Sequence, residues 1–282
     1  MNKSIAVIMT VHNRRETTMG CIRKFYQCQG VEDHDVEFYL MDDGCTDGTA
    51  EAIREEFPQV VILKGNGNLF WNRGMYECWK VAINKHHDYY LWLNDDTLVS
   101  LYCIDILLKT SKQHSDNAVV VGSTCSKNDP NEVTYGGVDE NNNRLTNVEI
   151  EQECFTFNGN IVLIPDLVLK TVGMNDPVYH HGAGDYDYGI RVRKAGLKNI
   201  IAPGILGVCD RHDGLQKWQD PSVPLTRRLR YLFELNGQIN PGDVFKYNIR
   251  YKGFFYSIRF YFLCLIRAFF PRYFIRKERN HN

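Results

Sequence analysis

The chain has 282 residues, of which 44% are hydrophobic and 24% charged, and this composition excludes a disordered or collagen-like protein. The length fits one large α/β domain, or one domain with a small addition. The formal net charge of −1 predicts no bulk attraction to nucleic acid. The charge is unevenly spread, however, because residues 225–282 carry 12 Lys and Arg against 3 Asp and Glu. We therefore expect an acidic body followed by a basic, aromatic C-terminal region.

The chain contains nine cysteines, and none of them forms a C-x-x-C pair. An odd number without this spacing predicts reduced thiols in a cytoplasmic protein, and argues against a disulfide framework or a zinc site. The apolar run near the N-terminus, residues 5–9, is short and predicts a strand instead of a signal peptide.

Short apolar runs alternate with helical patterns over the first hundred residues. The expected strands are 5–9, 36–41, 60–63 and 89–93, and the expected helices are 17–27, 47–57 and 72–86. This order predicts a mostly parallel sheet with helices on both faces. Beyond residue 100 the pattern predicts helices at 101–114 and 184–195, strands at 118–121, 155–163 and 198–202, and a hairpin or flap at 126–150.

A polar cluster follows each of the four early strands. The clusters are Thr10–Arg14, Asp42–Gly48, Gly65–Asn68 and Asn94–Thr97. Ligands of open parallel sheets bind outside the carboxyl ends of the strands, so we expect the four clusters to form one site. Turn chemistry alone favours Asp, Asn, Gly and Thr at such positions. Four clusters together, two of them with adjacent carboxylates, indicate a function.

The adjacent carboxylates Asp95 and Asp96 repel each other unless a cation or a bridging neighbour balances them. A hard divalent ion fits, since Mg²⁺ binds to a few carboxylates together with substrate phosphate oxygens. The alternative is that Asp95 and Asp96 only cap the following helix. Asp43 is better placed to accept a hydrogen bond from a base or a ribose.

Two arginines offer guanidinium groups that match phosphate oxygens. Arg14 and Arg73 are therefore candidates for contact with a diphosphate, although both could be solvated residues at helix starts.

These segments resemble the inverting nucleotide-sugar glycosyltransferases of family 2, which have the GT-A fold. The matching segments are Val7–Asn13, Met41–Thr49, Asn94–Asp96 in place of D-x-D, and Gly184–Arg191 in place of E-D-x-D-x-x-x-R. The resemblance covers residues 4–215, and the run 65–74 is similar to the G-N-x-N-x-G region of rhamnosyl- and galactofuranosyltransferase-like members.

The resemblance implies a GT-A domain over residues 1–224, with a nucleotide-sugar half (1–100) and an acceptor half (101–224). Residues 225–282 would form an amphipathic helical tail. It also implies transfer of a hexosyl or deoxyhexosyl group, dependent on Mn²⁺ or Mg²⁺, from a nucleoside-diphosphate sugar to a saccharide hydroxyl. The expected acceptor is a lipid-linked glycan in cell-surface polysaccharide or lipopolysaccharide biosynthesis.

The resemblance assigns roles to individual residues. Asp185 would be the catalytic base, and Asp96 and His212 would bind the metal. The positions expected to contact the nucleotide sugar are Thr10, His12, Asn13, Arg14, Asp43, Asn68, Arg73 and Asp95. On the residues alone, Asp185 is favoured because it lies at a helix N-terminus, which would stabilise its ionised form.

The chain departs from the family pattern at two positions, Asn94 and Gly184, where acids are usual. The departures leave Asp187 as an alternative base, and they leave open a degenerate transferase that acts as a binding module. A sugar-phosphate nucleotidyltransferase is less favoured, because Thr10–Arg14 stands where such an enzyme has G-x-G-x-R.

The segment Gly253–Phe270 is strongly apolar but is interrupted by Arg259 and Arg267, so its uncharged stretches are too short to span a bilayer. Basic residues beside aromatic ones predict a helix that lies on an anionic membrane. We therefore expect a peripheral protein on the cytoplasmic membrane face. The alternative is that the tail packs on the body or in a homodimer.

Overall fold

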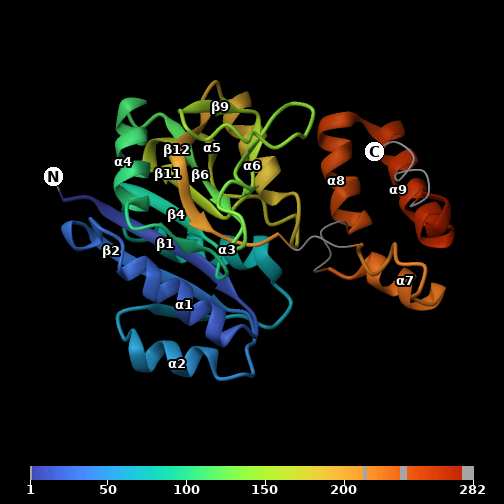
Figure 1. The fold of residues 1–282 in the computed structure, drawn as a ribbon, viewed down its shortest axis with the longest axis horizontal. Coiled ribbons are helices and arrows are strands. Elements are labelled where there is room, and N and C mark those ends of the chain that lie inside the picture. Colours follow the sequence, from blue (N-terminus) through green and yellow to red (C-terminus); the bar gives the residue numbers. More distant parts are fainter. Residues whose placement is uncertain (1, 212–214, 236–239, 275–282) are drawn as a thin grey trace. The chain divides into compact units, whose positions relative to one another are not determined.

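The computed structural model describes residues 2–211, 215–235 and 240–274 (Figure 1). The chain divides into two compact units: Met1–Pro177 with Gly184–Arg211, and Val178–Ala183 with His212–Asn282. The described residues 215–224 group with this second unit, whereas the sequence had suggested a boundary at Leu225. The second unit also takes in residues 178–183, which sequence reasoning had assigned to the body.

The main sheet of the first unit has the strand order β3-β2-β1-β4-β11-β6-β12-β5. The strands β3 (Val61–Lys64), β2 (Asp35–Asp42), β1 (Ser4–Val11) and β4 (Tyr89–Leu93) run parallel, as expected. Beyond β4 the sheet is mixed, because β11 (Ile161–Pro165) lies antiparallel to both β4 and β6 (Ala118–Cys125). The strand β12 (Lys198–Val208) is parallel to β6 and antiparallel to β5 (Leu98–Val99). The remaining strands are β7 (Val133–Tyr135), β8 (Gly137–Val138), β9 (Gln152–Cys154) and β10 (Thr156–Phe157).

Alternation along β1 creates two hydrophobic layers. Ile5, Val7 and Met9 face one side, and Ala6 and Ile8 face the other. The helices α1 (Arg15–Tyr26), α2 (Thr49–Glu56) and α4 (Cys103–Gln113) contribute to the first layer. The helices α3 (Phe70–Ala82), α5 (Asp166–Val172) and α6 (Gly184–Lys194) contribute to the second.

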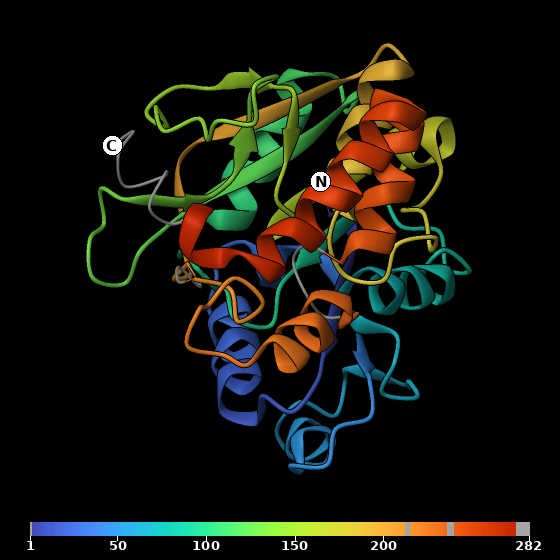
Figure 2. The same cartoon turned by 90° about the vertical axis from the view of Figure 1, so that its right-hand side faces the viewer.

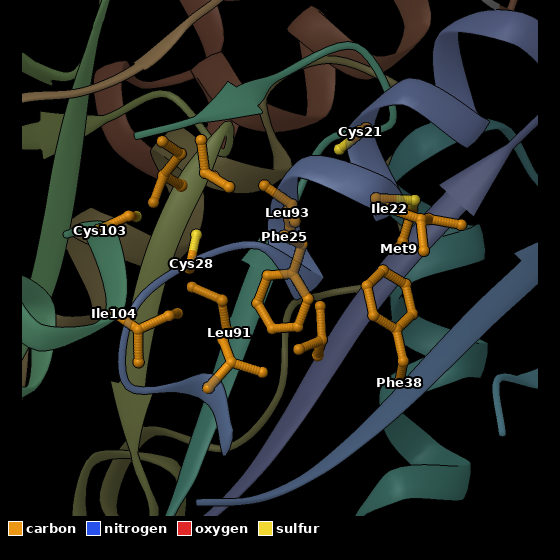
Figure 3. Close-up of a cluster of buried hydrophobic side chains, with 14 of the residues drawn as sticks. Met9, Cys21, Ile22, Phe25, Cys28, Phe38, Leu91, Leu93, Cys103 and Ile104 are labelled. Carbon is orange, nitrogen blue, oxygen red and sulfur yellow. The ribbon is translucent and has the colours of Figure 1, made fainter. Parts of the chain in front are cut away.

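The first layer brings together helix and sheet residues that lie far apart in the sequence (Figure 3). Phe25 of α1 lies among Phe38 of β2 and Leu91 of β4, and it packs edge-to-face on Phe38 with ring centroids 5.5 Å apart. This packing holds the strand ends, and the loops that follow them, at one edge of the sheet.

Most of the expected elements are confirmed, and the differences fall where tertiary contacts override local pattern. The expected strand 155–163 is broken into β10 and β11, with residues 158–160 between them. The strand β12 continues to Val208, beyond the expected end at residue 202, because it pairs with β6 along its length. The elements β5, β9, α5 and a 3-10 turn at Val31–Asp33 were not anticipated.

The second unit consists mainly of the helices α7 (Leu225–Phe233), α8 (Pro241–Lys252) and α9 (Phe254–Phe269), drawn in orange to red in Figure 2. Its small core contains Trp218, Leu232, Cys264 and Ala268. No helix in the described parts of the chain combines the length and the apolar character needed to cross a bilayer.

Candidate active site

The polar clusters after β1 and β2 are joined directly by hydrogen bonds. The Nδ1 atom of His12 lies 2.6 Å from the carbonyl oxygen of Asp43. Asn13, which has a positive φ of 51°, accepts a hydrogen bond of 2.8 Å from the backbone N–H of Thr46. The structure therefore brings these two clusters together at the carboxyl edge of the sheet.

Asp43, which the resemblance implied would contact the base, is hydrogen-bonded to the loop after β3. Its carboxylate is buried and accepts backbone N–H bonds from Gly67 (2.8 Å), Leu69 (2.9 Å) and Phe70 (2.9 Å). These bonds satisfy both oxygens, so Asp43 holds the loop after β3 in place. The loop approaches so closely that a Cβ on Gly44 would lie 3.0 Å from the backbone of Gly67.

Arg14 balances the adjacent carboxylates after β4. Its Nη1 atom lies 2.9 Å from Asp96 Oδ2 and 3.3 Å from Asp95 Oδ1. Burial raises the pKa of Asp95 to about 7, although the charge of Arg14 acts in the opposite direction. The adjacent acids had predicted a cation between them, and this guanidinium fills that role, a contact that sequence reasoning did not foresee.

Asp96 is the residue that best fits a divalent ion. Its side chain is 22% exposed, and its Oδ1 atom lies 3.5 Å from the sulfur of Cys209. Burial raises the pKa of the Cys209 thiol to about 12. No group of three or more His, Cys, Asp or Glu side chains gathers as a ligand set within the described residues.

A hard ion needs only one or two carboxylates when substrate phosphates supply the remaining oxygens. The carboxylate of Asp96 therefore fits an ion that arrives with a diphosphate. His212, the second expected ligand, lies outside the described residues.

Asn94, which replaces an acid of the family pattern, binds a tryptophan. The indole Nε1–H of Trp71 donates to Asn94 Oδ1 at 2.7 Å. A Cβ on Gly159 would lie 2.4 Å from the Trp71 ring and 3.6 Å from the Cβ of Asp185. The backbone of Gly159 thus lies between the indole and Asp185, and links the end of β4 to the start of α6.

Asp185 is half-buried and is held by backbone donors. Its Oδ2 atom accepts from Gly159 N–H (3.1 Å) and its Oδ1 atom from Tyr186 N–H (2.8 Å). Burial raises the pKa of Asp185 to about 6, against the effect of these two N–H groups. The N–H groups at the helix N-terminus favour the ionised form, as expected, but desolvation has the larger effect. A carboxylate with this pKa is mostly ionised at pH 7 and is close to the optimum for a general base.

Asp187 is fully buried and is part of a structural ion pair. It accepts from Arg191 Nε at 2.8 Å, and Arg191 also donates to the carbonyl oxygens of Val172 (2.9 Å) and Met174 (2.7 Å). The pair fixes the C-terminal end of α5 against α6. Of the two candidate bases, Asp185 is therefore the one whose surroundings suit proton transfer.

The second departure, Gly184, has a steric cause. A Cβ at this position would lie 1.9 Å from Asn72 Oδ1. Asn72 cannot easily move, because Asn175 Nδ2 donates to its Oδ1 atom (2.8 Å) and its own Nδ2 donates to the carbonyl of Asp176 (2.8 Å). The side-chain amide of Asn72 thus takes the space of the missing glutamate side chain. Asn72 was not singled out from the sequence.

The other residues that were expected to contact the nucleotide sugar lie on or beside α3. Arg73 Nε donates to the carbonyl oxygen of Pro177 at 2.9 Å, which anchors the start of α3 to the segment before α6. Asn68 N–H donates to Asn66 Oδ1 at 2.9 Å within the loop. Thr10 lies under α3, where a Cβ on Gly74 would come within 2.3 Å of its hydroxyl oxygen.

Comparison with known families identifies the domain. The model for glycosyl transferase family 2 matches residues 6–167, more than half of the chain. The chain belongs to glycosyl transferase family 2. Its fold is GT-A, with the mixed sheet described above, and it carries a glycosyltransferase domain. No curated protein matched the sequence.

Several solved structures share the fold. PcManGT, a mannosyltransferase from Pyrobaculum calidifontis solved with GDP-Man and Mn²⁺, aligns with 96% of this chain and 74% of its own, at 18% identity and a TM-score of 0.57. TarS from S. aureus aligns with 83% of this chain at 10% identity and a TM-score of 0.58. GalNAc-T7, solved with UDP, GalNAc and Mn²⁺, aligns with 73% at 14% identity and a TM-score of 0.56. The chain spans less than half of the last two, 43% and 42% of their lengths.

The contact between Gly184 and Asn72 leads to a stability prediction. We expect Gly184→Ala to lower the free energy of unfolding by about 1–3 kcal/mol, because the added methyl group forces the buried amides of Asn72 and Asn175 apart. Thermal unfolding measures the loss. Gly20→Ala is the matched control, since a Cβ in that part of α1 meets only Leu98 at 4.0 Å. An unchanged midpoint in Gly184→Ala would show that the Asn72 side chain yields without cost.

Proposed function

We propose that this family 2 member is a metal-dependent inverting glycosyltransferase. It would transfer a hexosyl or deoxyhexosyl group from a nucleoside-diphosphate sugar to a saccharide hydroxyl. The observation that carries the proposal is the position of Asp185. Its carboxylate accepts from the N–H of Gly159, Gly159 packs against Trp71, and Trp71 donates to Asn94 of the Asn94–Asp96 segment. The candidate base is thus linked through these contacts to the segment that carries the acids paired with Arg14.

In this mechanism Asp185 removes the proton of the acceptor hydroxyl as its oxygen attacks the anomeric carbon. A single displacement from the face opposite the diphosphate inverts the configuration. When bound at Asp96, a divalent ion would neutralise the charge that develops on the leaving diphosphate. Arg14, already hydrogen-bonded to Asp95 and Asp96, would turn its remaining N–H donors toward the diphosphate oxygens.

Two of the structural neighbours support the donor class and the metal. PcManGT was solved with GDP-Man and Mn²⁺, and GalNAc-T7 with UDP, GalNAc and Mn²⁺.

The metal assignment is tested by the variant Asp96→Asn. We expect it to lose most Mn²⁺-dependent binding of nucleotide sugars, because the neutral amide is a weaker ligand for a hard cation. Thermal shift against a panel of nucleotide sugars, with and without Mn²⁺, measures the binding. Asp33→Asn is the control, because Asp33 is exposed and is distant in the sequence from Asp96. Donor binding that stays Mn²⁺-dependent and undiminished in Asp96→Asn would place the ion elsewhere.

The base is tested by Asp185→Asn. We expect the variant to fold and to bind donor, but to lose turnover by ~10²–10⁴-fold. In the wild type, turnover should fall as the pH drops below about 6, because the base is then protonated. Burial raises the pKa of Asp95, on the proposed donor side, to about 7. Donor affinity is therefore measured over the same pH range, so that an effect of Asp95 on donor binding is separated from the effect of Asp185 on turnover.

Asp187→Asn separates the two candidate acids. It should destabilise the fold by leaving Arg191 without its buried partner, which is a different outcome from that of Asp185→Asn. If Asp185→Asn kept wild-type turnover, the base would have to be another group.

We further propose a lipid-linked acceptor and a peripheral location on the cytoplasmic membrane face. The support comes from α9, where Phe255 (86% exposed), Phe262 (57%) and Phe269 (46%) recur along one side of the helix. Arg259 is exposed on the same side, and a guanidinium there can reach lipid phosphates while the rings enter the interface.

Liposome flotation tests the membrane proposal. We expect the protein to float with anionic vesicles, and the double variant Phe255→Ser/Phe262→Ser to lose this binding while it remains folded. Each basic residue near the surface contributes about 1 kcal/mol, so added salt should weaken the binding. The control is Leu101→Ser/Leu167→Ser, which removes exposed apolar side chains from the first unit. Equal flotation with neutral vesicles would contradict the role of the basic residues, whereas no flotation, or dimers that the α9 variant dissociates, would favour protein packing instead.

A further inference from the structure

Trp71, the second residue of α3, is held at several points of its indole ring. Its Nε1–H donates to Asn94 Oδ1 at 2.7 Å. The ring packs edge-to-face on Trp92 of β4, with centroids 5.8 Å apart and 86° between the planes. The backbone that carries it is also fixed, because the N–H of Phe70, which has a positive φ of 57°, donates to Asp43 Oδ2 at 2.9 Å. The indole therefore has one defined position beside the end of β4.

The same ring contacts the backbone of Gly159. A Cβ on Gly159 would lie 2.4 Å from the Cζ2 atom and 2.6 Å from the Cη2 atom of Trp71. These distances leave no room for a side chain at position 159, so the glycine backbone itself lies against the indole. Gly159 is buried in this position.

The segment 158–160, between β10 and β11, is anchored on both sides of Gly159. The N–H of Asn158 donates to the carbonyl oxygen of Gly136 at 2.9 Å, and the carbonyl oxygen of Asn160 accepts from the N–H of Asn94 at 3.0 Å. The second bond continues the antiparallel pairing of β11 with β4. A glycine between two anchored residues keeps its own backbone freedom, and the indole of Trp71 is the group that restricts it.

The N–H of Gly159 is one of two backbone donors that hold Asp185. It donates to Oδ2 at 3.1 Å, and Tyr186 N–H donates to Oδ1 at 2.8 Å. Tyr186 is the next residue of α6 and moves with Asp185, whereas Gly159 comes from the edge of the sheet. The bond from Gly159 therefore fixes Asp185 relative to the end of β4, where the segment Asn94–Asp96 begins.

We propose that Trp71 is a positioning residue for Asp185. Hydrogen-bonded to Asn94, the indole holds the backbone of Gly159 in the place from which its N–H binds Asp185 Oδ2. This inference rests on the proposed role of Asp185 as the base. All of the groups that it joins lie within the first unit. Asn94, which stands where the family pattern has an acid, then acts on the base through the indole.

The bond from Gly159 also affects the ionisation of Asp185. Burial raises the pKa of Asp185 to about 6, and the N–H groups of Tyr186 and Gly159 act in the opposite direction. When an N–H group moves away it no longer stabilises the carboxylate, so the pKa rises further and more of the base is protonated at pH 7. The phenol of Tyr186 stays neutral over this range, because burial raises its pKa to about 12.

Hydrogen exchange in the full-length protein tests the contact without any substrate. Trp71→Phe removes the indole N–H and the ring atoms that touch Gly159, and Asn94→Leu removes the acceptor. We expect both variants to speed exchange by about three- to tenfold in peptides that contain Gly159, the effect of losing one hydrogen bond. Asn94→Asp keeps an oxygen acceptor for the indole and should retain wild-type exchange.

Trp79→Phe is the matched control for the exchange experiment. It makes the same chemical change on the same helix, but the buried indole Nε1 of Trp79 has no hydrogen-bond partner among the residues that the structure describes. Exchange in the peptides that contain Gly159 should therefore stay at the wild-type rate in this variant.

The pH profile of turnover gives the second readout, with the nucleotide sugar that best stabilises the wild type in the presence of Mn²⁺. The quantity compared is the acid limb, the pH at which turnover falls to half on the acidic side. We expect Trp71→Phe and Asn94→Leu each to raise it by about one pH unit, because the carboxylate loses one charge-assisted hydrogen bond. The double variant should raise it no further, because both changes act through the same contact.

Unaltered exchange at Gly159 in Trp71→Phe would overturn the proposal, and so would faster exchange with an unmoved acid limb. A higher KM for the acceptor with an unmoved limb would make Trp71 a substrate contact instead of a positioning residue. A wild type that turns over no nucleotide sugar would refute the proposed function. Exchange at Gly159 would still decide whether the indole holds this backbone.

Discussion

A carboxylate taken out of water must find donors or a cation, because the cost of burying its charge is several kcal/mol. The architecture around the site follows from this constraint. Asp43 meets it with three backbone N–H groups, which fixes the loop after β3. Asp95 and Asp96 meet it with the guanidinium of Arg14, which ties the start of α1 to the end of β4.

The two acids of α6, Asp185 and Asp187, differ in the kind of group that binds their carboxylates. Asp187 is paired with Arg191, whose other N–H groups clamp the backbone after α5, so its charge is committed to the fold. Asp185 is held by two backbone N–H groups, and burial leaves its pKa near the working range, at about 6. Two acids in one turn of α6 therefore differ in chemistry because of what surrounds them and not because of where they stand in the motif.

The two departures from the family pattern are consequences of packing. Asn94 accepts from the indole of Trp71, which an acid could also do, but the neutral amide adds no further charge beside Asp95 and Asp96. Gly184 makes room for Asn72, whose amide holds the segment before α6. Both of these positions contact a side chain from the first turn of α3, Trp71 for Asn94 and Asn72 for Gly184. The first turns of α3 and α6 are therefore packed together.

The sequence by itself determined the parallel half of the sheet, since alternating apolar runs and amphipathic helices leave few other arrangements. It also placed the polar clusters at one edge, because parallel strands end on the same side. The family resemblance added the motif residues Gly184–Arg191 to the cluster Asn94–Asp96. Local pattern did not reveal the antiparallel β11, whose place depends on pairing with β4 and β6.

Only the tertiary structure showed which acidic residues are held by partners within the fold. The partners of Asp43 are backbone N–H groups of the loop after β3, which is remote in the chain, whereas Asp187 pairs with Arg191, four residues on in the same helix. The membership of residues 178–183 in the helical unit was equally hidden, because it rests on Asp243, far along the chain from His180. Hydrogen-bond partners and desolvation are properties of three-dimensional surroundings, and the linear order of residues does not encode them in any local pattern.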